Sequence, residues 1–335
     1  MKRIALLFPG QGSQTVGMAK DLVTSFPYIR PLFEEADRLL QMSLSNVMFN
    51  SPMDELKQTE ITQPAVLLHS YSILKILEQE LIATPIDNRV DFVLGHSLGE
   101  YTSLLAARSI TFEQCLPLVH HRGQLMKQMK QGKMAAVLSR DDMLTPGSTL
   151  DRIKEYTQQL YRQDPVNDIC DVSNINSPNQ IVISGTVSGV DKTMSMLKEQ
   201  RLCRSIKQLE VSAAFHSKLM LPCSQEFESK HLNNINFKRP NYQVISNVTS
   251  RPYIEAADIK PLLSRQLVET VNWVSSIQYC LDGWKSKEAE TGNAGHLFVE
   301  IGPSSVLTQL LKQISPQSEY INISTTEDIR KFIKM

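Results

Sequence analysis

One short segment constrains this 335-residue chain more than any other, because it joins an apolar run directly to a helical one. The apolar run at residues 91–94 is followed at once by GHSLG at residues 95–99, and residues 98–108 have helical spacing. In a tight strand-to-helix turn, glycines flank the serine because larger side chains would clash with the crowded backbone. The turn presents the serine hydroxyl at the carboxyl edge of a sheet. This pattern predicts that Ser97 is a nucleophile in an α/β protein.

The rest of the chain contains further apolar runs that alternate with helical segments. The runs at residues 4–8 and 296–301 each end in a glycine-containing turn, as expected of central parallel strands covered on both faces. Helical spacing is found at residues 63–82, 98–108, 112–130 and 304–314. Strands that alternate with helices predict a mainly parallel sheet with helices on both faces.

The middle of the chain has a different rhythm. From residue 134 to residue 211 the expected order is strand, helix, strand, strand, helix, strand, which is the ferredoxin-like arrangement. We therefore predict a small subdomain at residues 133–211, inserted into a larger α/β domain formed by residues 1–132 and 212–335. The polar stretch at residues 140–149 is expected to be an exposed loop.

A nucleophilic serine needs a general base, and seven histidines could supply it. His216 follows the last predicted subdomain strand, in a loop where the insertion rejoins the main domain, which is a good place for a cleft. His96 is adjacent to the serine, but neighbours in a tight turn point in different directions. His69 lies in a helical segment and suits a packed, hydrogen-bonded histidine. On the residues alone His216 is the leading candidate, and the others stay open.

A second glycine-rich element, PGQGSQ at residues 9–14, follows the first strand. It lacks the Gly-Lys-Ser/Thr ending and the GxGxxG spacing of loops that bind nucleotide phosphates. The main-chain N–H of Gln11 could instead complete an oxyanion hole with that of Leu98, which opens the helix after Ser97. A plain turn explains the spacing equally well.

Composition and charge exclude several classes of protein. Lys and Arg number 35, as do Asp and Glu, so the chain lacks the positive field of a dedicated nucleic-acid binder. No apolar run approaches the ~18 residues of a membrane span. The five cysteines are scattered without a CxxC pair, which predicts buried thiols in a reducing compartment rather than a zinc or redox site.

Eight ordered motifs resemble those of the malonyl-CoA:acyl-carrier-protein transacylases, the acyltransferases that load malonyl units in fatty acid synthesis. They cover residue 4 to about residue 314. They are GQGSQ at 10–14, TQPA at 62–65, GHSLGEY at 95–101, HRG at 121–123, NINSP at 174–178, FHS at 215–217, RQL at 265–267 and EIGP at 300–303. The resemblance implies a hydrolase-like α/β core that carries a ferredoxin-like insertion.

The resemblance also implies catalytic roles. Ser97 would carry the malonyl ester and His216 would be the base. The second imidazole nitrogen of His216 would bond the main-chain carbonyl of Gln266, which gives a dyad rather than a full triad. Gln11 and Leu98 would form the oxyanion hole through their main-chain N–H groups.

Three further residues are assigned to substrate binding by the same resemblance. Arg122 would bind the free carboxylate of malonate, and Gln63 and Asn174 would also contact substrate. Malonyl-CoA differs from acetyl-CoA by that carboxylate, and a buried arginine selects it with bidentate geometry. Without the resemblance, Arg122 would be interpreted as a solvated helix residue.

The resemblance implies that the substrates are malonyl-CoA and a holo acyl carrier protein, with no cofactor and no metal, and that the protein is a monomer. A basic rim would suit an acidic carrier, and its candidates by charge are Lys127, Lys130, Lys133 and Arg201. The stretch from Leu138 to Ser173 is longer than in the compact bacterial pattern. This length favours the mitochondrial matrix, with a bacterial cytoplasm as the alternative.

Other functions remain open at this level. A serine hydrolase or thioesterase would need an acidic residue between Ser97 and His216 in chain order, and the insertion offers Asp164, Asp168 and Asp171. A transferase for another acyl group, such as methylmalonyl in a polyketide pathway, would also use a cation at Arg122. A scaffold without catalysis is a third alternative, although the serine, the histidine and the arginine are all present.

Overall fold

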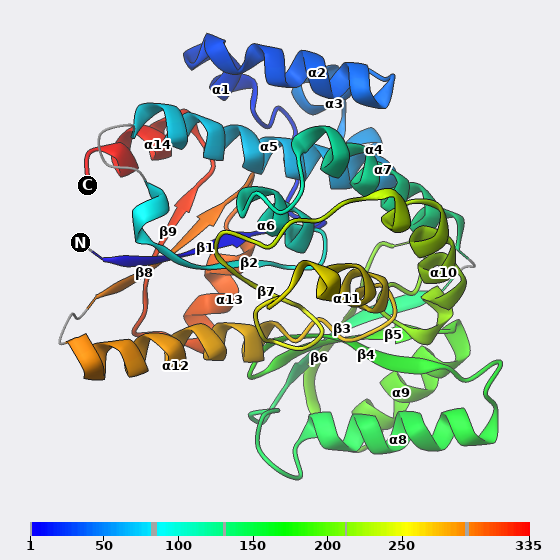
Figure 1. The fold of residues 1–335 in the computed structure, drawn as a ribbon. Coiled ribbons are helices and arrows are strands. Elements are labelled where there is room, and N and C mark those ends of the chain that lie inside the picture. The colour runs from blue at the N-terminus through cyan, green and yellow to red at the C-terminus, as the bar shows by residue number, and fades with distance from the viewer. Residues whose placement is uncertain (1, 82–85, 130–131, 212, 292–294) are drawn as a thin grey trace.

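The computed structural model describes residues 2–81, 86–129, 132–211, 213–291 and 295–335 (Figure 1). Three predicted boundaries lie outside the described residues: residue 82, residue 212 and Lys130, which is also a candidate for the basic rim. Within the described residues the strands form a five-stranded parallel sheet and a four-stranded antiparallel sheet. The predicted fold class, an α/β core with a mainly parallel sheet plus a small inserted sheet, is confirmed.

The parallel sheet has the strand order β7-β2-β1-β8-β9. Its strands are β1 (Arg3–Phe8), β2 (Val90–Gly95), β7 (Gln243–Ile245), β8 (His296–Ile301) and β9 (Glu319–Ile323). The three predicted apolar runs are the three central strands, where both faces must be covered. The two edge strands were not predicted, because one has only three residues and the other mixes polar and apolar residues without a clear period.

Helices cover both faces of the parallel sheet. Along β1, Ile4 and Leu6 face one helical layer while Ala5 and Leu7 face the other, because successive strand residues point to opposite sides. The first layer includes α5 (Thr59–Glu80), α6 (Gly99–Ala106), α7 (Phe112–Gln128) and α14 (Thr326–Ile333). The second consists of α12 (Trp273–Thr291) and α13 (Val306–Ile314). The predicted helices at 63–82, 98–108, 112–130 and 304–314 correspond to α5, α6, α7 and α13.

The remaining core helices lie around this sandwich. They are α1 (Lys20–Ser25), α2 (Arg30–Leu40), α3 (Leu44–Asn50), α4 (Met53–Leu56), α10 (Leu221–Lys230) and α11 (Ile259–Gln266). In Figure 1, α1, α2 and α3 lie outside α5. Helix α11 packs against α10. None of the described helices is both long enough and apolar enough to cross a membrane.

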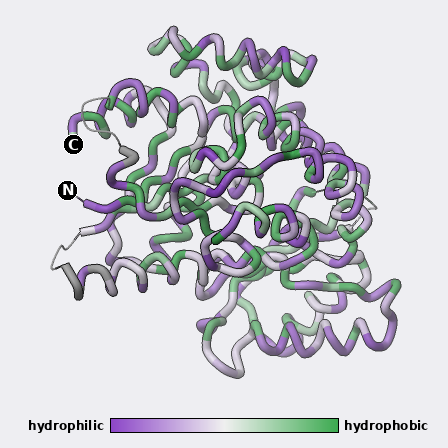
Figure 2. Tube along the Cα trace, in the orientation of Figure 1, coloured by the Kyte–Doolittle hydropathy of each residue, from purple (hydrophilic) through white to green (hydrophobic). Residues whose placement is uncertain are grey.

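The antiparallel sheet has the order β4-β5-β3-β6 and two helices on one face. Its elements are β3 (Lys133–Ser139), α8 (Thr149–Gln163), β4 (Cys170–Ser177), β5 (Gln180–Gly185), α9 (Val187–Glu199) and β6 (Cys203–Gln208). Val137 and Ile183 pack beneath α8 and α9, while Met134 and Val182 face the large domain. Figure 2 shows that much of α8 is hydrophilic, as expected of a helix that buries a single stripe. The subdomain limits of 133 and 211 stay a prediction, and the sheet lies within them.

One local prediction is wrong in part. The stretch at 140–149 was expected to be exposed, but Met143 is only 1% exposed and packs in the small core. The main-chain N–H of Met143 also donates to the carbonyl of Pro178 at 2.6 Å. A single apolar side chain therefore anchors an otherwise polar loop, which average polarity does not reveal.

The five cysteines are free and buried, as predicted. Among the described residues, no group of three or more His, Cys, Asp or Glu side chains is placed to hold a metal ion.

Candidate active site

Ser97 sits in a sharp turn between β2 and α6, with a backbone φ of +52°. This left-handed conformation is unusual for a non-glycine residue and is typical of strained functional positions. A Cβ added to Gly95 would lie 1.8 Å from the carbonyl carbon of Gly99, and one added to Gly99 would lie 2.0 Å from the oxygen of Phe8. Both glycines of the motif are therefore required by close backbone approach.

Asn247, in the segment after β7, braces this turn from a sequence distance of 150 residues. Its Oδ1 accepts from the main-chain N–H of Ser97 at 2.7 Å, and its Nδ2 donates to the carbonyl of Gly95 at 2.6 Å. The side chain is almost fully buried. The Asn247 amide thus provides hydrogen-bond partners for two main-chain groups of the turn, the N–H of Ser97 and the carbonyl of Gly95.

His216 completes a dyad with Ser97. The Nε2 of His216 lies 2.8 Å from the Oγ of Ser97, and its Nδ1 lies 2.7 Å from the main-chain oxygen of Gln266. A carbonyl can only accept, so Nδ1 carries the proton and the lone pair of Nε2 faces the serine hydroxyl. Gln266 is the last residue of α11, where carbonyl groups lack intrahelical donors and the helix dipole is negative.

Burial keeps this imidazole neutral. Desolvation, together with the positive charge of Arg122, lowers the pKa of His216 to about 3. The hydrogen bond to Gln266 acts in the opposite direction. His216 is therefore unprotonated at neutral pH, with the lone pair of its Nε2 facing the Ser97 hydroxyl.

The three aspartates that were candidates for the acid of a hydrolase triad are engaged elsewhere. Asp164 binds Asn167, Asp168 pairs with Lys192, and Asp171 pairs with Lys218. The group that orients His216 is a main-chain carbonyl instead.

Arg122, on α7, is 1% exposed and points at the dyad. Its Nη2 donates to the Oγ of Ser97 at 3.2 Å and to the Oε1 of Gln266 at 3.0 Å, and its Nη1 donates to the Oε1 of Gln63 at 2.7 Å. The guanidinium also lies over the ring of Tyr101, with 5.3 Å between its carbon and the ring centroid. Among the described residues, no salt bridge neutralises this buried cation, and its Nε lacks a partner. Such a buried charge calls for an anionic ligand.

These groups line a cleft of about 540 Å³ between the two sheets. Gln11 and Leu98 border it near Ser97, on the loop after β1 and at the start of α6. The Leu98 N–H stands at a helix start, where main-chain donors lack intrahelical acceptors. Asn174 borders the cleft from β4, and its Oδ1 accepts from the hydroxyl of Ser173. Ser97, His216, Arg122, Gln63 and Gln266 are thus joined by direct hydrogen bonds, while Gln11, Leu98 and Asn174 share their cleft.

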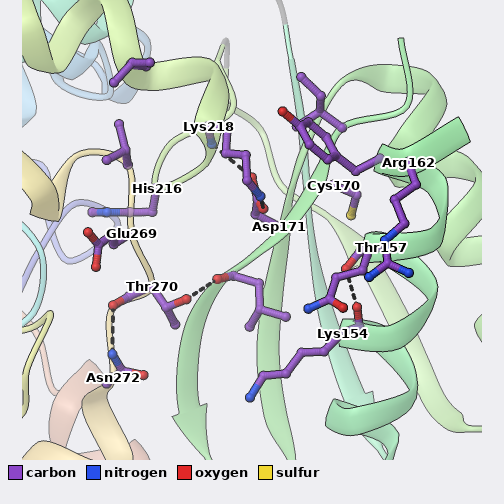
Figure 3. A pocket seen from close by; sticks show the side chains of 16 residues that line it. Lys154, Thr157, Arg162, Cys170, Asp171, His216, Lys218, Glu269, Thr270 and Asn272 are labelled. Carbon is purple, nitrogen blue, oxygen red and sulfur yellow. Dashed lines mark hydrogen bonds and ion pairs between the residues drawn. The ribbon is translucent and has the colours of Figure 1, made fainter. Parts of the chain in front are cut away.

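A second cavity of about 880 Å³ lies on another side of His216 (Figure 3). Lys154, Thr157 and Arg162 line it from α8, and Asp171 lines it from β4. Figure 3 shows Asp171 paired with Lys218. Ser97 and Arg122 are not among the lining residues of this cavity.

Sequence reasoning missed the polar residues beneath the cleft. Glu100 is buried, and desolvation raises its pKa to about 7. It accepts from the hydroxyl of Tyr253, the Nε2 of Gln266 and the main-chain N–H of Asn247. The only signal in the sequence was an acidic residue in an apolar helix beside the serine motif. Asn247 and Tyr253 carried no signal because they lie about 150 residues away in the chain.

Comparison with known proteins agrees with this arrangement. The sequence profile of the acyl transferase domain family matches residues 5–328, nearly the whole chain. The chain therefore belongs to the acyl transferase family and, within it, to the malonyl CoA-acyl carrier protein transacylases, because its full-length relatives carry that description.

One such relative is the malonyl CoA-acyl carrier protein transacylase of Bacillus subtilis, 36% identical over 100% of this chain and 97% of its own length. The crystal structure of an acyl-carrier-protein-S-malonyltransferase from Bartonella henselae superposes with a TM-score of 0.85 at 31% identity, covering 99% of this chain and 98% of that one. A malonyl-transacylase in complex with its type II PKS acyl-carrier protein superposes with a TM-score of 0.85 at 30% identity, covering 99% of each chain.

Proposed function

We propose that this protein transfers the malonyl group of malonyl-CoA to the phosphopantetheine thiol of an acyl carrier protein, through a malonyl ester on Ser97, for fatty acid synthesis. The observation that carries the proposal is Arg122. It is a buried guanidinium held by two neutral amide oxygens, with one N–H directed at the oxygen that would carry the acyl group. A cation so placed selects an acyl group that ends in a carboxylate.

The first half-reaction uses the dyad. The Oγ of Ser97 attacks the thioester carbonyl while its proton passes to the Nε2 of His216, 2.8 Å away. The imidazolium that forms is stabilised by the Gln266 carbonyl and the C-terminal end of α11. His216 then gives the proton to the departing CoA sulfur, which leaves a malonyl ester on Ser97.

The oxyanion of the tetrahedral intermediate needs donors on the other side of the carbonyl. The main-chain N–H groups of Leu98 and Gln11 are the proposed pair, because both residues border the cleft beside Ser97. Asn174 and Gln63 have supporting roles in this scheme. Gln63 holds Arg122, and Asn174 offers an amide to the substrate arm from the insertion.

The second half-reaction reverses the first. The carrier thiol gives its proton to His216 and attacks the ester, and Ser97 recovers its hydroxyl proton. The ester must survive in water until the thiol arrives, so the narrow cleft between the sheets also protects the intermediate. The carrier as partner is supported by the complex of a structural neighbour with its acyl-carrier protein.

The scheme needs no cofactor or metal, since CoA and the carrier are both substrates, and we expect a monomer. The relatives from Bacillus subtilis and Bartonella henselae are bacterial, which favours a bacterial cytoplasm and does not support the predicted mitochondrial matrix.

The alternative readings have less support. A hydrolase triad lacks its acid, because His216 is oriented by a carbonyl. Methylmalonyl also carries a carboxylate, so it belongs in the test as a competing substrate.

The test is intact-protein mass spectrometry after brief mixing with malonyl-CoA, acetyl-CoA or methylmalonyl-CoA. We expect one malonyl adduct on the wild-type protein that is discharged by a holo carrier protein. Ser97→Ala should abolish the adduct, while Ser229→Ala, an exposed helix position, should leave it intact. Free malonate and CoA without an adduct would indicate a hydrolase. Equal amounts of adduct from acetyl-CoA and malonyl-CoA would contradict the proposal that Arg122 selects an acyl group with a carboxylate.

A further inference from the structure

A buried polar cluster lies directly beneath the proposed acyl site. Glu100 is on the first turn of α6, three residues after Ser97, and its side chain is fully buried. One carboxylate oxygen accepts from the hydroxyl of Tyr253 and the main-chain N–H of Asn247. The other accepts from the Nε2 of Gln266 at 2.6 Å. These three partners donate, so the network accommodates the ionised carboxylate.

Gln266 connects this carboxylate to the cation above it. Its Nε2 donates to Glu100 and also to the main-chain oxygen of Ser97 at 2.9 Å, while its Oε1 accepts from the Nη2 of Arg122 at 3.0 Å. The two ends of the amide therefore face opposite kinds of partner. A rotated amide would direct its oxygen at two acceptors and its N–H groups at a guanidinium, which can only donate.

We infer that Glu100 is a positioning residue for malonyl selectivity, because it fixes the Gln266 amide with its oxygen toward Arg122. This inference rests on the proposed malonyl transfer. Glu100 also lies one amide away from Arg122 instead of in contact with it. The remaining N–H groups of Arg122 therefore stay free of a competing protein carboxylate.

The substitution that tests this is Glu100→Gln, which keeps the shape of the side chain but can donate from one end. When that NH₂ faces Gln266, the Gln266 amide is stabilised in the rotated state, with its own NH₂ against Arg122. The measured quantity is the rate of acyl-enzyme formation from malonyl-CoA divided by that from acetyl-CoA. We expect the ratio to fall about 10- to 100-fold, the range for one hydrogen bond to a charged group.

Tyr253→Phe is the matched control. It removes a hydrogen bond from the same carboxylate but leaves the Gln266 contact in place. We expect a lower melting temperature with the malonyl-to-acetyl ratio within about threefold of wild type. If Glu100→Gln and Tyr253→Phe lower both acylation rates in proportion to their loss of stability, Glu100 has only a structural role and the inference is overturned.

A double-mutant cycle makes the test specific. Gln266→Leu removes the amide but keeps the carbonyl that orients His216, so it should also reduce the ratio. If Glu100 acts through Gln266, adding Glu100→Gln to Gln266→Leu should lower the ratio no further. Additive losses would contradict the inference. If Glu100→Gln does not fold, Gln266→Leu still tests the inference. An unchanged malonyl-to-acetyl ratio in Gln266→Leu would overturn it. A wild-type protein without a malonyl adduct would instead mean that the proposed function itself has failed.

Discussion

The parallel-sheet core and the antiparallel insertion meet at one cleft but contribute different kinds of group to it. The side chains bonded to the Oγ of Ser97, those of His216 and Arg122, both come from the core. The insertion contributes a wall, with Met134, Val182 and Asn174 among its residues. A parallel sheet ends in turns and helix termini whose main-chain groups lack partners, whereas an antiparallel sheet offers a flat face of alternating side chains. The ends of the parallel sheet therefore suit groups that take part in a reaction, and the face of the antiparallel sheet suits a wall that shapes the cleft.

The two regions also differ in their titratable groups. The seven histidines lie outside residues 133–211, and the fully buried Glu100 and Glu300 belong to the core. The regions also contact each other at the cleft, where the Nε2 of His96 lies 2.9 Å from the Oδ1 of Asn176. Catalysis and sensitivity to acid should therefore be properties of the core, and substrate access a property shared with the insertion.

Removal of the base should have the largest effect. His216→Ala should slow formation of the malonyl enzyme by about 10²- to 10⁴-fold, the usual range for general-base catalysis. The measurement is the rate at which the adduct appears by mass spectrometry. His121→Ala is the control, because His121 stacks on His231 and does not line the cleft. A comparable fall in the rate of adduct formation in an insertion variant such as Asn174→Ala would contradict the conclusion that the reacting groups belong to the core alone.

Removal of the cation should come next. Arg122→Ala should weaken use of malonyl-CoA by about 30- to 5000-fold, since unpairing a buried carboxylate costs about 2–5 kcal/mol. Acetyl-CoA should lose far less, because it has no carboxylate to pair. Arg162→Ala, in the second cavity, is the matched control and should change neither rate. Equal losses for both thioesters would show that Arg122 supports the fold rather than selects the acyl group.

The buried histidines of the core should make it sensitive to acid. Burial lowers the pKa of His69 to about 4 and that of His216 to about 3, both below the usual 6.5. As pH falls below 6.5, the unfolded chain binds protons that the folded chain does not, so stability is lost on acidification. Between pH 7.5 and 5.0 each histidine should lower the free energy of unfolding by roughly 2 kcal/mol.

Tryptophan fluorescence during denaturant unfolding can follow this change, because Trp273 and Trp284 both pack in the core. Glu100 and Glu300 act in the opposite direction, because burial raises the pKa of both carboxyls and the folded chain then binds protons that the unfolded chain does not. His69→Gln should reduce the loss of stability between pH 7.5 and 5.0 by roughly 2 kcal/mol, since glutamine does not titrate. An unchanged pH dependence in this variant would assign the acid sensitivity to other groups.

The smallest effect should come from the wall. Asn174→Ala should raise the KM for malonyl-CoA roughly 3- to 10-fold, the value of one lost hydrogen bond, with little change in the rate at saturation. Steady-state kinetics of transfer to a carrier protein measure both the KM for malonyl-CoA and the rate at saturation. Asn167→Ala, on the insertion but outside the cleft, should behave as wild type. A fall in the saturated rate alone would place Asn174 with the reacting groups of the core.

How much of this could be predicted from the sequence depended on how local each feature is. The three central strands were predictable because both faces are buried and the runs are continuously apolar. The edge strands β7 and β9 were not, because short or mixed segments carry no clear period. The sequence predicted a basic rim for an acidic carrier by charge alone. Two of its lysines are paired with carboxylates of this chain, Lys127 with Glu60 and Lys133 with Asp191.

At the site, Ser97 followed from its motif, whereas His216, Gln266 and Arg122 depended on the resemblance. The sequence offered seven histidines, and the loop position of His216 made it the leading candidate without excluding the others. The fold makes the choice, because only the path of the chain around the insertion brings a residue 119 positions away to within hydrogen-bond distance of Ser97.

The sequence by itself determined what neighbours in the chain decide: the two-sided burial of the central strands, the glycine-flanked turn at Ser97 and the β-α-β-β-α-β order of the insertion. These follow from periodicity and crowding within a few residues. The tertiary structure alone decided that Arg122 is a buried cation held by amides and that Glu100 fixes the amide of Gln266. Those properties depend on partners brought together from about 60 to 170 residues apart, and no local pattern encodes such a meeting.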